Sequence, residues 1–206
     1  MKNPMFQTAA GVAIPFPEKM KEEYQAFEKC IRFHVSFQKL GAMLEDFLTR
    51  LMEPLFFVLQ LPLTRQEEEA LGAKTGQRLA NASHERVCYL DGQSKEQIRA
   101  ILRQYGELLL NDGISQFGVA SHAIYDEMFI MKYKLVDIYS DNPSKYIDLM
   151  EHYELAPTDK LLTAWDTFSR ETPGQTRRIE MDGITVYEVY DALVNLGLYE
   201  AKIIDG

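Results

Sequence analysis

The spacing of apolar residues along the chain predicts a helical N-terminal segment. From residue 18 to residue 52 the apolar residues recur at helical spacing, on one face before Phe33 and on another after it. Two helices, or one kinked helix, would explain this change of face. The alternation of apolar and polar residues within 31–37 is instead typical of a strand. We favour helix for 18–52, because no turn residues bound the alternating run.

Five later segments have the length and apolar content of strands. The clearest is LFFVLQL at 55–61, which lies between Pro54 and Pro62 and has the character of a buried central strand. The loop at 121–126 joins two of these segments with six residues, which predicts an antiparallel hairpin. The predicted strands are 55–61, 86–90, 114–120, 127–139 and 178–181.

Helix-start signals separate these strands. Capping boxes begin at Thr64, Ser94 and Thr185, and each has Glu or Gln three residues later. Two further helices are predicted to begin at Asn142, where a proline follows in the first turn, and at Thr158.

These elements predict an α+β fold in which residues 1–206 form a single domain. We expect a mixed, partly antiparallel sheet of about five strands, with helices packed on it and with the helical segment 18–52 packing on the domain. The order of elements is not a regular βαβ alternation, which disfavours a doubly wound nucleotide-binding fold. The polar segment 72–84 has few large apolar residues and is predicted to be a mobile loop.

Composition and charge narrow the classes of function. The 206 residues include 22 Lys and Arg against 31 Asp and Glu, a formal net charge of -9. This balance lacks the basic footprint of a nucleic-acid-binding protein and suits a basic partner. No segment approaches the roughly 20 apolar residues of a membrane helix. Two cysteines without a spaced framework fit a reducing compartment, so we expect a cytoplasmic protein.

The best candidate for chemistry is the loop that holds His122, Asp126 and Glu127 beside a predicted strand. A carboxylate next to an imidazole can orient it and raise its basicity, as a general base requires. The same three residues could supply part of a site for a hard metal ion. The competing interpretation is a polar loop at the tip of a hairpin. The chain has no HExxH, P-loop, GxGxxG or GxSxG motif, and we expect no metal and no cofactor.

Two other groups are candidates for binding. Alternation along 127–139 places Lys132 and Lys134 on one face of the predicted strand, where they could bind an anionic ligand or an acidic partner. The competing interpretation is a solvated or edge face of the sheet. Trp165 and Asp166 form the second group, because tryptophan is a frequent interface anchor. The competing interpretation places Trp165 in the core, at helical spacing with other apolar residues.

Three stretches resemble a group of uncharacterised bacterial cytosolic proteins of this size: EPLFFVLQLPL at 53–63, GELLLNDGISQFGVASH at 106–122 and LLTAWDTFSRETPG at 161–174. Small acidic α+β proteins of bacteria include many immunity proteins, which neutralise a toxin by binding it. This analogy of size, charge and class, together with the net negative charge, the lack of catalytic motifs and the resemblance, leads us to expect a non-enzymatic protein of the immunity type that binds a basic protein partner. It assigns no role to any residue.

Two alternative functions remain open. One is a small hydrolase or metal-assisted enzyme built around His122, Asp126 and Glu127. The other is a structural subunit that forms a homodimer through the N-terminal helices, whose two apolar faces exceed what one sheet needs.

Overall fold

A computed structural model describes residues 6–75 and 83–206. Within these residues it contains five α-helices and eleven strands, which confirms the α+β class. The helices are α1 (Phe37–Arg50), α2 (Arg65–Thr75), α3 (Lys95–Asn111), α4 (Ile147–His152) and α5 (Val186–Val194). The strands are β1 (Val12–Ala13), β2 (Glu23–Ala26), β3 (Cys30–His34), β4 (Leu55–Pro62), β5 (His84–Gln93), β6 (Gln116–Ser121), β7 (Glu127–Ile130), β8 (Val136–Tyr139), β9 (Ala156–Pro157), β10 (Gln175–Thr176) and β11 (Tyr199–Asp205).

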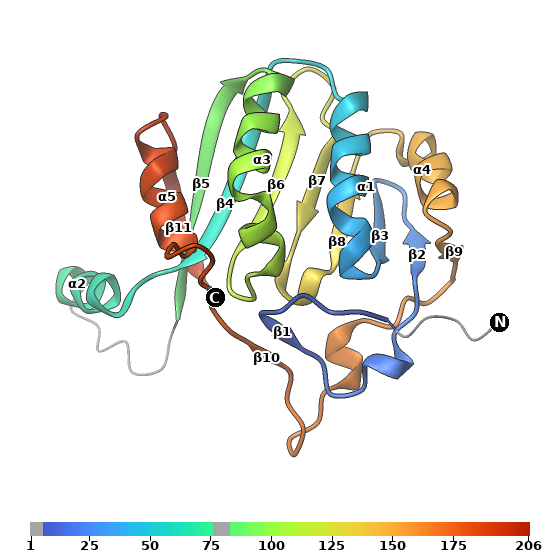
Figure 1. Ribbon diagram of the computed structural model, residues 1–206, viewed down its shortest axis with the longest axis horizontal. Helices are drawn as coiled ribbons and strands as arrows, with labels where there is room; N and C mark the ends of the chain where they lie inside the picture. Colours follow the sequence, from blue (N-terminus) through green and yellow to red (C-terminus); the bar gives the residue numbers. More distant parts are fainter. Residues whose placement is uncertain (1–5, 76–82) are drawn as a thin grey trace.

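The main sheet has nine strands among the residues described, so the expectation of about five is wrong. Their spatial order is β11–β5–β4–β6–β7–β8–β3–β2–β9 (Figure 1). Neighbouring strands are antiparallel except for β2 and β9, which are parallel, so the predicted mixed sheet is confirmed. The short strands β1 and β10 pair separately at one end of the molecule.

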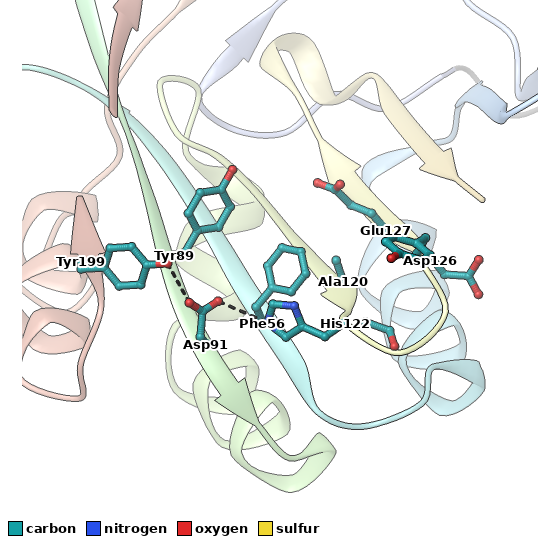
Figure 2. A pocket seen from close by; sticks show the side chains of 10 residues that line it. Phe56, Tyr89, Asp91, Ala120, His122, Asp126, Glu127 and Tyr199 are labelled. Atoms are coloured by element: carbon teal, nitrogen blue, oxygen red, sulfur yellow. Dashed lines mark hydrogen bonds and ion pairs between the residues drawn. The ribbon is translucent and has the colours of Figure 1, made fainter. Parts of the chain in front are cut away.

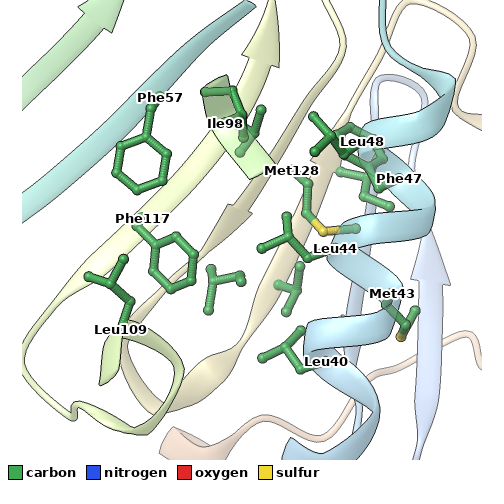
Figure 3. Packing of buried hydrophobic residues seen from close by; sticks show 14 of the residues in the cluster. Leu40, Met43, Leu44, Phe47, Leu48, Phe57, Ile98, Leu109, Phe117 and Met128 are labelled. Carbon is green, nitrogen blue, oxygen red and sulfur yellow. The ribbon is translucent and has the colours of Figure 1, made fainter. Parts of the chain in front are cut away.

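One continuous apolar core lies between this sheet and the helices α1, α3, α4 and α5, which cover the same face (Figure 1). Phe57 of β4 contacts Phe117 of β6 with ring centroids 6.0 Å apart, Leu109 of α3 lies beside Phe117 (Figure 3), and Leu44 and Phe47 of α1 belong to the same buried cluster. All five side chains are at most 2% exposed. Burying each one contributes about 1.5–3 kcal/mol, so this core fixes the sheet that carries the site.

The N-terminal segment is only partly helical, and the prediction of helix throughout 18–52 is wrong. Strands β2 and β3 form a hairpin closed by a hydrogen bond from the Phe27 amide to the Cys30 carbonyl (2.7 Å). The helix α1 begins only after Ser36. The strand alternative for 31–37 was therefore correct for β3, whose pairing with β8 outweighs the local helical spacing. Within 18–52 the structure describes one α-helix, α1, and its apolar residues are buried in the chain's own core. Homodimerisation stays a prediction.

The predicted strand 127–139 is interrupted. Strands β7 and β8 form an antiparallel pair joined by a 3₁₀ turn, Lys132–Lys134. Tyr133 and Lys134 both have a φ of 56°, a left-handed conformation that bulky residues adopt rarely. Nothing in the local sequence predicts such a turn, because neither residue is a turn former.

The C-terminal third also differs from expectation. The segment after Thr158 holds a 3₁₀ turn, Ala164–Thr167, rather than an α-helix. Residues 178–181 contain only a single bridge, from Met181 to Ile184, instead of a strand. Strand β11 was not anticipated, although it pairs along most of β5. Of the loop predicted at 72–84, residues 76–82 lie outside the described residues, and 72–75 belong to α2.

Candidate functional site

The face of the sheet opposite the helices, here called the outer face, carries the candidate site. Along a strand, successive side chains point to opposite faces. In β4 the core takes Leu55, Phe57 and Leu59, so the intervening Phe56 and Val58 point to the outer face. Antiparallel register extends this face to Ala120, which lies opposite Phe56. Registers with the neighbouring strands extend the same face to Tyr89 of β5 and Glu127 of β7.

A cavity of about 430 Å³ lies at one end of the outer face. The strands β4, β5, β6, β7 and β11 and the loop between β6 and β7 supply its walls (Figure 2). Its lining consists of Phe56, Tyr89, Asp91, Ala120, Ser121, His122, Tyr125, Asp126, Glu127 and Tyr199. Four of these ten residues are Phe or Tyr, and three carry carboxylates.

Aromatic rings form a connected wall along one side of this cavity. Phe56 contacts Tyr89 edge to face, with ring centroids 5.8 Å apart, and Tyr89 contacts Tyr199 at 6.3 Å. The imidazole of His122 packs on Phe56 with a centroid distance of 4.6 Å. The Tyr199 hydroxyl donates a hydrogen bond to Asp91 (2.7 Å), which fixes the end of this wall on β5.

The structure places the three predicted chemistry residues around the cavity but does not join them. No hydrogen bond or ion pair connects any two of His122, Asp126 and Glu127, all of which lie in the described part of the chain. The Nε2 of His122 lies 3.4 Å from an oxygen of Asp91 instead. Figure 2 shows the Asp126 carboxylate directed away from Phe56 and His122, while Glu127 points to the outer face.

Asp126 has an internal role. Its fully buried carboxylate accepts hydrogen bonds from Lys145 Nζ (2.5 Å) and from the Tyr146 hydroxyl (2.8 Å). Burial, followed by this hydrogen bond to Asp126, raises the pKa of Tyr146 far above its ordinary value. These contacts tie the hairpin loop to the start of α4, so we assign Asp126 to positioning of the cavity rim.

Glu127 is the available carboxylate of the cavity. It lies half-buried at the start of β7, opposite Ala120 on one side and Tyr139 on the other. Among the residues that the structure describes, its side chain has no hydrogen-bond or ion-pair partner. Burial raises the pKa of Glu127, and the negative charge of Asp137 raises it further. Both effects disfavour the charged form, so a cation beside Glu127 would relieve them.

Other charged groups of the outer face already have partners. Arg32 binds Asp137 through two hydrogen bonds of 2.7 Å, and Asp137 also accepts from the Tyr139 hydroxyl (2.9 Å). The buried carboxylate of Glu85 accepts hydrogen bonds from Gln60 and Gln116 and forms an ion pair with Lys132 (2.5 Å).

The two lysines predicted to bind an anion do not share a strand face. Lys132 lies in the 3₁₀ turn and is held by Glu85. Lys134 is only 6% exposed, and its Nζ donates to the Leu109 carbonyl at the end of α3 (3.0 Å). The expectation that both lysines lie on an alternating strand is therefore wrong, because the left-handed turn redirects the second one into the interior.

Trp165 and Asp166 lie in the 3₁₀ turn Ala164–Thr167 and do not line the cavity. Trp165 is 43% exposed, so the core interpretation is wrong for this residue, and its ring contacts Tyr133 at 5.1 Å. Asp166 accepts hydrogen bonds from the amide and hydroxyl of Thr163 and so stabilises the turn.

Sequence reasoning missed most of the aromatic wall. Strand alternation within 55–61 puts Phe56 on the face opposite the core residues, and alternation within 86–90 does the same for Tyr89. Both residues could therefore have been found from the sequence. Asp91 precedes Gly92, and this Asp-Gly pair is a turn signal in the sequence rather than a signal of a site. Tyr199 had no local signal, because the strand that carries it was not predicted.

Within the described residues, no helix is long and apolar enough to cross a membrane, and no group of three or more His, Cys, Asp or Glu side chains could hold a metal ion. No protein-family model matches the chain, and neither curated proteins nor solved structures provide a match.

Proposed function

We propose that this protein is a non-enzymatic binding protein that recognises a basic protein partner through the outer face of its sheet. The observation that carries the proposal is the preformed cavity, which combines an aromatic wall with a carboxylate, Glu127, that has no partner among the described residues. The formal net charge of -9 supports a basic partner by charge complementarity.

The residue types of the cavity fit a protein interface. Tyrosine is enriched in interfaces because it offers a large contact area and a polar hydroxyl at low entropic cost. Tyr125 and Tyr199 are 77% and 48% exposed, so their rings are accessible from solvent. Strands β4, β5, β6 and β7 of the cavity contribute side chains to the core, which keeps this part of the surface preorganised, while Tyr125 lies in the loop after β6 and Tyr199 on the edge strand β11.

The finer role that we propose is that of a cytoplasmic immunity-type protein, which would neutralise a basic toxin by covering it with the outer face. The cytoplasmic location is supported by Cys30 and Cys88, which are both free. Burial of these thiols raises their pKa values, to about 12 and about 11, so they are poor nucleophiles.

The test is co-purification of the tagged full chain from its native host, followed by titration of the captured protein after separate purification. We expect a basic protein that binds with a submicromolar Kd, and we expect the affinity to fall as salt rises from 50 to 500 mM. A salt-independent complex with a neutral or acidic protein, or no complex at all, would contradict the proposal.

The enzyme alternative has one supporting observation, the approach of His122 Nε2 to Asp91 within the cavity (3.4 Å). A carboxylate at this position could orient the imidazole for general-base chemistry. The same co-purification distinguishes the two functions. Mass spectrometry of the partner after incubation would show cleavage or modification that His122→Ala abolishes if the chain is an enzyme, and an unchanged mass if it only binds.

A further inference from the structure

We propose that the cavity accepts an arginine side chain of the basic partner, with the guanidinium paired to Glu127 and stacked on the aromatic wall. This inference rests on the proposed function and specifies the group that is recognised.

The charges around the cavity favour a cation. Glu127 has an uncompensated carboxylate, as far as the described residues go, and Asp91 supplies a second carboxylate on β5. Among the described cations of the outer face, Arg32 is paired with Asp137 and Lys132 with Glu85, whereas Lys202 on β11 is exposed and has no partner in the described part of the chain. Lys145, near the rim, is held by Asp126. The lining of the cavity contains these carboxylates but no Lys or Arg, so an anionic ligand is disfavoured.

The aromatic wall favours a planar cation over a compact one. Phe56, Tyr89 and Tyr199 form a chain of ring contacts on the side of the cavity that carries Asp91. A guanidinium can stack on a ring while its edge donates two parallel hydrogen bonds to a carboxylate. An ammonium can do only one of these with good geometry. The cavity of about 430 Å³ also lies within the range of roughly 300–1,000 Å³ that is usual for ligand pockets.

The half-buried position of Glu127 strengthens its pairing with a guanidinium. The carboxylate is half-buried between Ala120 and Tyr139 of the neighbouring strands, where water solvates it poorly. A guanidinium that reaches it would replace the missing solvation with charge-assisted hydrogen bonds, which are about twice as strong as neutral ones. This contact therefore discriminates more strongly than a pairing on the exposed rim.

The experiment uses the full chain and a fluorescein-labelled nine-residue peptide of alternating glycine and arginine, with lysine and citrulline peptides of the same design as comparisons. Citrulline keeps the planar shape of arginine but has no charge. We expect the arginine peptide to bind at least about fivefold more tightly than the lysine peptide, and the citrulline peptide to show no measurable binding.

Variants separate the cavity from general charge attraction. Glu127→Gln removes the carboxylate charge with little change in shape, and we expect it to weaken binding of the arginine peptide at least about tenfold. The matched control is Glu107→Gln, which removes the same charge from an exposed position on α3 and should change the affinity less than twofold. Tyr199→Leu removes an exposed ring of the wall and should reduce the preference for arginine over lysine.

Equal effects of Glu127→Gln and Glu107→Gln, or equal affinities for arginine and lysine peptides, would overturn the inference. The native partner distinguishes this failure from that of the proposed function. If the co-purified basic protein binds the wild type and Glu127→Gln equally well, the cavity inference fails and the binding function stands. If no basic partner binds the wild type, the proposed function fails as well.

Discussion

At the residue scale, His34 is a titratable group sealed in the interior. Its side chain is fully buried, and neither ring nitrogen has a hydrogen-bond partner. The ring of Phe6 packs against it edge to face at 6.1 Å. Burial and, to a smaller extent, the positive charge of Arg32 lower the pKa of His34, the negative charge of Asp166 opposes them in part, and the resulting pKa is about 4. The folded protein therefore holds this imidazole neutral.

This burial makes stability depend on pH in a defined window. In the unfolded chain His34 takes up a proton near its ordinary pKa of about 6.5, whereas the folded chain resists until about pH 4. The unfolded state thus binds more protons between these values, and stability is lost as pH falls from about 6.5 to about 4. The loss attributable to His34 is at most about 3 kcal/mol.

We expect urea denaturation to give a lower free energy of unfolding at pH 4.5 than at pH 7 in the wild type. In His34→Leu this difference between the two pH values should be smaller. The control is His152→Leu, which replaces an exposed histidine and should leave the pH dependence unchanged. Identical pH dependence in the wild type and His34→Leu would contradict the assignment.

Individual residues of the candidate site were partly predictable. The imidazole and the two carboxylates that the sequence places beside a strand all line the cavity, and their functional role stays a prediction. The different roles of the neighbours Asp126 and Glu127 were not predictable, because Asp126 lies in the loop before β7 and is held by Lys145 and Tyr146. The pairing of His122 with Asp91 was not predictable, since it depends on how β5 lies beside β4.

At the element scale, the turn between β7 and β8 is held by the end of a helix that precedes it by twenty residues. Lys134 donates to the Leu109 carbonyl, one of the last carbonyls of α3, which have no partner within the helix. Burial lowers the pKa of Lys134 to about 8, and the nearby charge of Asp112 counteracts this effect. The lysine is therefore mainly charged at pH 7 and satisfies an otherwise orphaned acceptor.

We expect Lys134→Met, which keeps most of the apolar volume, to lower the free energy of unfolding by about 1–3 kcal/mol, because the buried Leu109 carbonyl loses its donor. Lys160→Met is the control at an exposed position and should stay within about 0.5 kcal/mol of the wild type. The measurement is chemical denaturation at pH 7. A Lys134→Met protein as stable as the control would show that the contact adds nothing to stability.

Helices that begin at a capping box were predicted better than strands that form only by pairing with a distant strand. The capping boxes at Ser94 and Thr185 are formed, and α3 and α5 begin where they indicate. Strand β3 looked helical by spacing, and β11 carries exposed residues without an apolar face. Strand β3 forms because its backbone pairs with β8, and β11 forms because its backbone pairs with β5. The periodicity of a sequence does not indicate such pairing.

At the scale of the whole molecule, a backbone junction joins three distant parts of the chain. The Gly11 amide donates to the Asn111 carbonyl at the end of α3 (2.7 Å), and the Gly113 amide donates to the Arg177 carbonyl (3.0 Å). The Arg177 amide returns a bond to the Gly11 carbonyl (2.8 Å). This junction connects the main core to the strands β1 and β10 and to the small apolar cluster beside them. That residues 1–206 form a single domain stays a prediction, and a variant that disrupts this junction tests it.

Gly113 allows this junction because it has no side chain. A Cβ placed there would lie 1.9 Å from the Gly11 carbonyl oxygen and 2.8 Å from the Arg177 amide, and backbone atoms cannot rotate away. We expect Gly113→Ala to destabilise the protein by about 3 kcal/mol, as overpacking adds to lost hydrogen bonds. The control is Gly106→Ala inside α3, where the new Cβ meets Leu102 at an ordinary 3.6 Å and alanine favours the helix.

Thermal unfolding and amide hydrogen exchange together show how far that damage spreads. If the parts form one cooperative unit, Gly113→Ala lowers a single unfolding transition, and exchange accelerates in the core strand β4 as much as at Gly11 and Arg177. If they are separate units, a second transition appears, and β4 keeps its protection while the junction amides exchange quickly. A wild-type unfolding curve for Gly113→Ala would contradict the steric argument itself, because the three atoms nearest that Cβ are all backbone atoms.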